Sequence, residues 1–231
     1  MILTDSQNLI LSITGLTNLG MSLFVFFRGQ KNKINLYFSL MTFFVFLWSA
    51  SLVFYNISLS EDALRFFSSL PYTMAWLVIV FLFYFSLYFP YKKIQINKLF
   101  KWLINIVSIL IIIYTIFGYN YFVDSVRIGS INFATYNNAG YIIYTIFMVL
   151  VIFSAIYFLV DKYIKSDGIF RTQIGLVLFG VIMGTAFGSY FNLFSMYKDN
   201  FTSIHMGPLF TLFINLVVFG FIISPKEKIN D

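Results

Sequence analysis

Seven long apolar runs, separated by short polar breaks, dominate the pattern of residues along the chain. The runs comprise residues 9–27, 34–56, 66–89, 99–118, 141–160, 172–196 and 203–223. Each is close to the roughly 20 residues that an α-helix needs to cross a bilayer. None contains Asp, Glu, Lys or Arg away from its ends. The pattern therefore predicts an all-α membrane protein, folded as a bundle of seven transmembrane helices.

The Lys and Arg residues are distributed unevenly between alternate breaks. The rich breaks contain Arg28, Lys31, Lys33, Lys92, Lys93, Lys98, Lys101, Lys162, Lys165, Arg171, Lys226 and Lys228. The other breaks contain only Arg65, Arg127 and Lys198. Because cytoplasmic loops are enriched in Lys and Arg, this bias predicts an N-terminus outside and a C-terminus inside the cell. The net charge of +6 then indicates contact with an anionic lipid leaflet rather than with nucleic acid.

Composition leaves little chain outside the membrane. Of the 231 residues, 60% are hydrophobic and 22% are aromatic, so we expect one membrane domain covering residues 1–231. The chain has no cysteine, which excludes disulfides, thiol nucleophiles and cysteine-based metal sites. We therefore expect no catalytic residues, no metal site and no cofactor.

The longest polar break, residues 119–140, has an internal pattern of its own. Its apolar residues, on either side of Gly129 and Ser130, are Val126, Ile128, Ile131 and Phe133. Apolar segments on both sides of a turn-forming pair are typical of a β-hairpin. A two-stranded ribbon is only marginally stable unless it docks on the bundle, so the predicted hairpin depends on such docking.

Uncharged polar residues are the candidates for ligand binding, because the runs lack the ionisable groups that pumps and coupled transporters use at depth. We expect a ligand pocket that opens outward, formed by the last three helices and the tip of the 119–140 loop. Its predicted residues are Tyr136, Asn137, Asn138, Tyr190, Asn192 and His205. A histidine titrates near neutral pH, so a ligand-binding or pH-sensing role for His205 is open, but a solvated histidine at the membrane interface is the favoured interpretation.

Small residues and amides inside the runs indicate how the helices pack. Gly180, Gly184 and Gly188 recur at a spacing of four, which places them on one helix face and permits close approach of a second helix. A helix of the same bundle is the favoured partner, and the seam of a homodimer is the alternative. Asn18 and Asn215 also lie inside apolar runs, where amides usually form hydrogen bonds between helices.

Several short motifs stand at the ends or in the middle of the predicted helices. They are Asn35–Leu40 and Leu47–Ser49 in the second run, Phe81–Pro90 closing the third, Gly140–Tyr144 opening the fifth, Arg171–Gln173 opening the sixth and Gly207–Leu209 opening the seventh. With these motifs, residues 8 to 224 resemble the N-terminal seven-helix sensor domain of bacterial membrane histidine kinases. The better markers are Trp48, the Gly140–Tyr141 pair and the Gly207–Pro208 pair.

The resemblance implies a receptor-like input domain in the plasma membrane of a bacterium, which responds to an unidentified small ligand or peptide. Binding near the outer ends of the last three helices would shift the packing of the last two at the cytoplasmic end, near Ser224. Family members usually continue into a cytoplasmic dimerisation and kinase region, whereas this chain ends at Asp231 without an ATP-binding motif. We expect either a truncated input module or a stand-alone relative that signals through a partner such as a cytoplasmic kinase.

Two other functions are open alternatives. A small solute carrier or permease is disfavoured by the lack of an internal repeat and of buried charges, but facilitated diffusion of an apolar or sugar-like solute needs neither. An accessory or immunity protein would act by binding another membrane protein. A membrane enzyme is the least expected, because the sequence has no acid, base or metal cluster.

Overall fold

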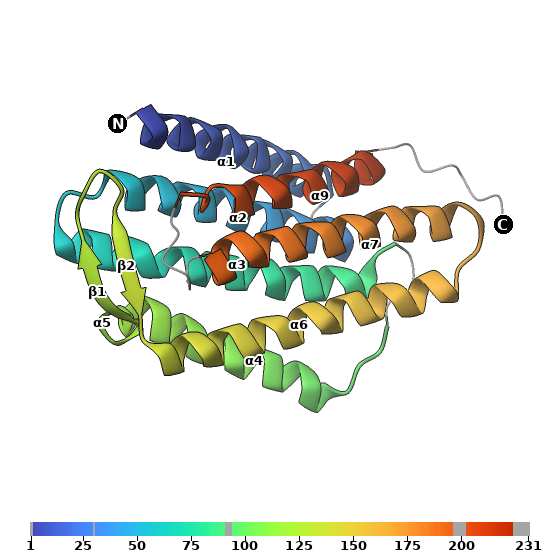
Figure 1. Ribbon diagram of the computed structural model, residues 1–231. Coiled ribbons are helices and arrows are strands. Elements are labelled where there is room, and N and C mark those ends of the chain that lie inside the picture. Colours follow the sequence, from blue (N-terminus) through green and yellow to red (C-terminus); the bar gives the residue numbers. More distant parts are fainter. Residues whose placement is uncertain (1, 30, 91–93, 196–201, 224–231) are drawn as a thin grey trace.

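The computed structural model describes residues 2–29, 31–90, 94–195 and 202–223, which form an elongated helical bundle (Figure 1). Within these residues, six helices are long and apolar enough to cross a membrane, and one shorter apolar helix follows them. This arrangement confirms the predicted membrane architecture of apolar helices.

The helices follow the predicted runs in order. The six long helices are α1 (Ile2–Gly29), α2 (Lys33–Ile57), α3 (Glu61–Tyr88), α4 (Lys98–Ile112, continued by a π-helical turn), α6 (Asn138–Ile164) and α7 (Gly168–Ser189, also continued by such a turn), and the shorter one is α9 (Met206–Ile223). Two π-helical turns, η1 (Ile113–Phe117) and η2 (Tyr190–Phe194), extend α4 and α7. A single turn, α5 (Tyr119–Phe122), leads from η1 into a small sheet.

Most helices are longer than their apolar runs, because polar residues cap them. The Ser60 side chain accepts a hydrogen bond from the amide of Ala63 at 3.3 Å, so α3 begins at Glu61 rather than at 66. The opposite holds for the last helix, which begins at Met206 rather than at 203, since a turn precedes it. The predicted end of the sixth run at Met196 lies outside the described residues, as do Lys92, Lys93, Lys198, Lys226 and Lys228.

Helix α3 forms the centre of the bundle, with α2 on one side and α6 on another (Figure 1). In its most apolar window 78% of the residues are buried, compared with 22% in α4 and 22% in α7. Trp76 and Phe83 of α3 are fully buried. Helices α2, α4 and α6 contact α3 directly, whereas α1 packs on α2, and α7 packs on α6 and α9.

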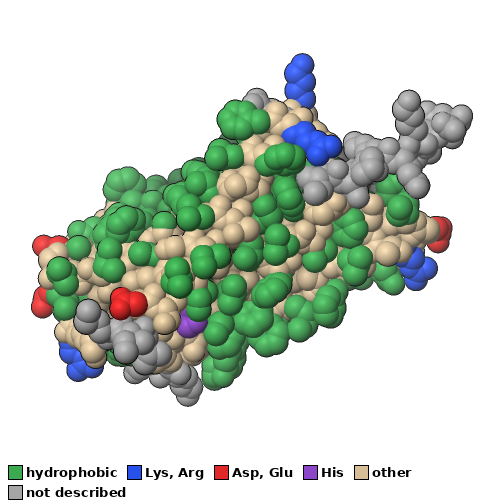
Figure 2. Space-filling view, turned by 90° about the horizontal axis from the view of Figure 1, so that it is seen from above, with side chains coloured by type: hydrophobic (Ala, Val, Ile, Leu, Met, Phe, Trp, Pro, Cys, Tyr) green, Lys and Arg blue, Asp and Glu red, His purple; other side chains and the backbone are tan. Residues whose placement is uncertain are grey.

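Hydrophobic side chains form the surface between the ends of the bundle. Figure 2 shows them over the middle of the visible face, with charged side chains at its margins. Phe27, Trp102, Phe153 and Tyr157 each expose more than 60% of their surface. An exposed apolar surface of this extent is expected where lipid, rather than water, surrounds the protein.

Lys162 links α6 to α3 at the end of the bundle away from the sheet. Its side chain is 5% exposed, and Nζ donates hydrogen bonds to the carbonyls of Leu87, at 2.9 Å, and Phe89, at 2.6 Å. These carbonyls lie at the C-terminus of α3, where the helix dipole favours a cation. Lys162 was predicted only as a charge of the cytoplasmic break, and the structure places it inside the protein.

A two-stranded antiparallel sheet occupies part of the long polar segment at the other end, called here the sheet end. Strand β1 (Val123–Arg127) pairs with β2 (Phe133–Tyr136), in a register that aligns Val126 with Ala134. A bulge between Val123 and Ser125 shifts the register.

Asn132, in the turn between the strands, fastens the sheet to α2. Its Nδ2 donates to the carbonyls of Tyr55, at 2.8 Å, and Ser58, at 3.2 Å, while the Tyr55 hydroxyl donates to the Asn132 carbonyl at 2.6 Å. Arg65 of α3 also donates to the carbonyl of Val123 in β1. These bonds supply the support that an isolated two-stranded ribbon lacks, and they satisfy the last carbonyls of α2.

Replacing Asn132 with alanine is expected to loosen the sheet and to lower the free energy of unfolding by about 1–3 kcal/mol, because buried carbonyls of α2 lose their donor. Hydrogen exchange of the protein in lipid nanodiscs would show faster exchange in residues 123–136. Asn120→Ala, at an exposed position of α5, is the control and should leave exchange unchanged. Equal exchange in the two variants would contradict the role given to Asn132.

Candidate ligand cavity

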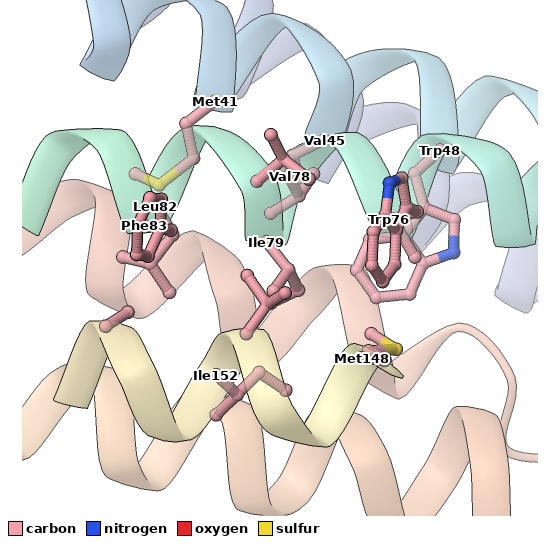
Figure 3. Close-up of a cluster of buried hydrophobic side chains, with 14 of the residues drawn as sticks. Met41, Val45, Trp48, Trp76, Val78, Ile79, Leu82, Phe83, Met148 and Ile152 are labelled. Atoms are coloured by element: carbon pink, nitrogen blue, oxygen red, sulfur yellow. The ribbon is translucent and has the colours of Figure 1, made fainter. Parts of the chain in front are cut away.

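A cavity of about 50 Å³ lies inside the bundle, between α2, α3 and α6 on one side and α7, η2 and α9 on the other. Helix α3 and its neighbours form an apolar wall. Figure 3 shows this wall, in which Ile79 of α3 points toward Ile152 of α6, with Met41 and Met148 nearby. The side chains of this wall are flexible or branched and apolar. None of the described residues that line the cavity is charged.

The opposite wall carries uncharged polar residues. Asn215 of α9 is fully buried, and its Nδ2 donates to Oδ1 of Asn18 in α1 at 2.6 Å. This bond confirms the predicted role of both amides in joining helices. The Oδ1 atom of Asn215 is buried with no hydrogen-bond partner among the described residues. Asn215 is among the residues that line the cavity, so an acceptor without a partner lies, fully buried, in the cavity wall.

Asn192 of η2 closes the cavity toward the sheet end. Its side-chain nitrogen donates to the carbonyl of Ile204 at 3.1 Å, and its oxygen accepts from the amide of Gly207 at 3.2 Å. A Cβ atom at position 207 would lie 2.6 Å from Cγ of Asn192, so only glycine permits this contact. The Gly207–Pro208 pair noted in the sequence therefore marks the point where α9 meets η2.

A cluster of aromatic rings connects the cavity to the sheet. The Tyr72 ring of α3 makes edge contacts with Tyr136 of β2, at 4.9 Å between centroids, and with Tyr144 of α6, at 5.4 Å. The Tyr144 hydroxyl donates to the Tyr72 carbonyl at 2.9 Å. Burial in this cluster raises the pKa of the Tyr136 phenol, which therefore stays neutral. Tyr72 and Tyr144 also line the cavity, so the sheet and the cavity share one set of side chains.

Comparison with known protein families identifies the family to which this chain belongs. The family described as the N-terminal 7TM region of histidine kinase matches residues 10–225. The chain belongs to this family. No curated protein matches the chain.

Membership in the histidine kinase 7TM family makes the chain a sensory transmembrane domain and a membrane protein. It also places the chain in a signalling context, and no catalytic domain is indicated in it. Among the described residues, no group of three or more His, Asp or Glu side chains could hold a metal ion.

The six residues predicted for a pocket do not form a single site in the histidine kinase 7TM domain. Asn192 lines the cavity, whereas Tyr190 is 54% exposed and lines a separate groove between α6 and η2. Tyr136 belongs to the aromatic cluster described above. Asn137 accepts from the amide of Gly140 at 3.0 Å and caps α6, while Asn138 is exposed in its first turn.

The placement of Tyr136, Asn137 and Asn138 at the tip of a loop was wrong. They lie at the base of the sheet, where β2 leads directly into α6. Asn137 caps this helix, which begins at Asn138, three residues before the predicted run 141–160. The turn of the sheet lies instead around residues 128–132.

His205 is buried rather than solvated, which corrects the interpretation favoured from the sequence. It is 8% exposed, and its Nδ1 has no partner among the described residues. Burial lowers the pKa of the imidazole, because the charged form loses its hydration.

Several cavity residues were not predicted as site residues. Trp48, Tyr72, Tyr144, Thr211 and Asn215 line the cavity, but the sequence shows them only as polar or aromatic residues within apolar runs. Their positions in the middle of helices were the signal in the sequence that could have pointed to a site. That signal was insufficient, because the sequence does not reveal which helix faces meet.

Two of the three ladder glycines contact α9. A Cβ atom at Gly184 would meet the Ile214 side chain, with Cγ1 at 2.7 Å, and one at Gly180 would lie 3.7 Å from the same residue. Gly188 has open space within 4 Å and lines the cavity. In this chain, therefore, Gly180 and Gly184 lie against α9, and Gly188 leaves room beside it.

Gly184→Ala is expected to lower the free energy of unfolding by about 1–3 kcal/mol, since the new methyl group overlaps Ile214. Gly220→Ala adds the same methyl group in open space on α9 and should be neutral or slightly stabilising. Thermal unfolding of the two variants in the same detergent measures the difference. Equal melting temperatures would contradict the close α7–α9 contact.

The burial of His205 predicts acid sensitivity. Because its pKa in the folded state is lower than the ordinary 6.5, the unfolded chain binds more protons as the pH falls below that value, and folding stability decreases. At higher pH the imidazole is neutral in both the folded and the unfolded chain, so its contribution to folding stability no longer changes with pH. His205→Gln should flatten this part of the curve of melting temperature against pH. A variant curve parallel to that of the wild type would show that His205 does not titrate in this way.

Proposed function

We propose that this 7TM domain binds a cue in the central cavity and passes a change of helix packing to a cytoplasmic signalling output. The sheet end would lie outside the cell and the Lys/Arg-rich end inside, as the distribution of these residues suggests. In this proposal residues 1–231 act as a single membrane domain in a bacterial plasma membrane, and a kinase or kinase-like partner receives the signal.

The position of the cavity between two groups of helices is the observation that carries the proposal. Helices α7 and α9 pack closely through Gly184 and Ile214, and the rings of Phe187 and Phe210 stack at 4.5 Å. On the other side, Phe44 of α2 stacks on Phe81 of α3 at 5.4 Å. A molecule in the cavity would touch both groups at once.

Binding can change the packing only through a difference in affinity. A ligand that fits one spacing of the two groups better than another shifts the population toward that spacing. Helix shifts of about 1–2 Å at such interfaces are typical of switching proteins. Because α6 and α9 both run to the end away from the sheet, a change beside the cavity would reach the cytoplasmic face through them.

A side chain that fills the cavity serves as a test without a known ligand. Gly188 lines the cavity with open space around its Cα, so the side chain of Gly188→Leu should enter it and push the two groups apart. The chain has no cysteine, and spin labels can be placed at Ile164→Cys on α6 and Gly220→Cys on α9 without background. We expect the distance between the labels in nanodiscs to change by about 1–2 Å.

Gly20→Leu is the matched control, because position 20 is exposed on α1 and also has open space. Its distance distribution should equal that of the labelled parent. If Gly188→Leu folds and gives the same distribution as Gly20→Leu, the cavity is not coupled to the far ends of α6 and α9, and the proposal fails.

A further inference from the structure

A second hollow lies on the side of the bundle, between α6 and the end of α7 with η2. This lateral groove has a volume of about 480 Å³ and is lined by apolar and aromatic side chains that include Ile142, Ile146, Tyr190 and Phe194. About half of the surface of each of these four side chains is exposed. The groove therefore opens on the surface that faces lipid, at the level of the membrane-spanning helices.

The groove and the cavity are neighbours, because Ser189 and Leu193 line both. Leu193 belongs to the π-helical turn η2, and it is 7% exposed. Its carbonyl accepts a hydrogen bond from the hydroxyl of Tyr141 in α6 at 2.8 Å, which holds η2 against α6. The Leu193 side chain thus stands at the passage from the lipid-facing groove to the interior.

The chemistry of the two hollows is complementary. The groove offers apolar surface, while the wall of the cavity contains Oδ1 of Asn215, which has no partner among the described residues. This oxygen is fully buried, so a ligand reaches it only by parting the side chains around it. No charged residue is among the described residues that line either of them. An ionised group in this place would lose its hydration without gaining a counter-ion, so the fitting ligand is neutral. A single hydrogen-bond donor, such as a hydroxyl group, would complete the bonding of Asn215.

The two hollows differ in enclosure, since the cavity of about 50 Å³ lies inside the bundle and the groove of about 480 Å³ is open at the surface. The end of a ligand fits the small cavity, and an extended chain fits the open groove. We propose that the ligand of this domain is a neutral, single-chain amphiphile dissolved in the bilayer. Its chain lies in the lateral groove, and its one donor group passes Leu193 and donates to Oδ1 of Asn215.

This inference rests on the proposed function, since it names the ligand class of the same cavity. It also gives the route of entry, because an apolar molecule concentrated in lipid reaches the groove without crossing water. The ligand then acts as a wedge between α6 and the α7–α9 group.

The test uses a long-chain alcohol that carries a photoreactive diazirine near its hydroxyl group, added to the full chain in phosphatidylcholine vesicles. Its methyl ether has the same chain and lacks the donor. After illumination, mass spectrometry locates the labelled residues. We expect the alcohol to label η2 and α9 about fivefold more than the ether does, the equivalent of ~1 kcal/mol for one hydrogen bond inside a membrane protein.

Two pairs of variants separate the route from the acceptor. Leu193→Trp should block the passage and reduce labelling of α9 about fivefold, while Leu150→Trp, at a lipid-facing position of α6, should not. Asn215→Leu should abolish the preference for the alcohol. Asn18→Leu breaks the same bond between α1 and α9 but keeps the Asn215 amide, so it should retain the preference.

Equal labelling by the alcohol and the ether in the wild type would overturn the inference, as would labelling confined to lipid-facing residues of α4 and α6. The result is independent of signalling. If Gly188→Leu shifts the helix ends and the alcohol does not label the cavity, the proposed function stands and this ligand class is wrong. If the alcohol labels the cavity and Gly188→Leu shifts nothing, the site is real and the proposed coupling is wrong.

Discussion

Polar groups between the two ends of this bundle must find their partners inside the protein, because lipid offers none. Most of them do so locally, as Thr42 and Ser49 show by donating to carbonyls one turn earlier in α2. A few join distant helices, such as the Asn18–Asn215 pair. Within this rule the open acceptor of Asn215 is an exception, and it lies in the wall of the cavity. The same constraint that holds the helices together therefore draws attention to the site that we propose.

Hydrophobic length was enough to find the helices, since each run had to match the bilayer and no other element of that length fits it. Their ends were harder, because polar caps such as Ser60 and Asn137 continue a helix beyond its apolar part. The two π-helical turns left no sequence signal that we could identify. The cavity was not predictable, because it is formed where Ile79, Ile152 and Ile214 meet across long separations in sequence.

The candidate site was predicted only in part for a related reason. Asn192 was expected near the start of the last helix, and it bonds there to Ile204 and Gly207. Tyr190, two residues earlier, was expected beside it but faces the other way, because η2 places one side chain toward the interior and another toward α6 and the lipid. Residues two apart on a helix lie on nearly opposite faces, so the spacing of Tyr190 and Asn192 itself argued against placing both side chains in one pocket.

The buried amine of Lys162 has a mechanical consequence for the whole bundle. Its two bonds reach carbonyls at the very end of α3, and a side chain of fixed length can reach them only from one height on α6. If α6 slid along α3 by one helical turn, about 5.4 Å, the ammonium group would lose these hydrogen bonds and lie unpaired in an apolar interior. The contact therefore opposes piston-like sliding of α6 along α3. In the proposed function, a signal would then cross the membrane by tilting or rotation of helices rather than by such sliding.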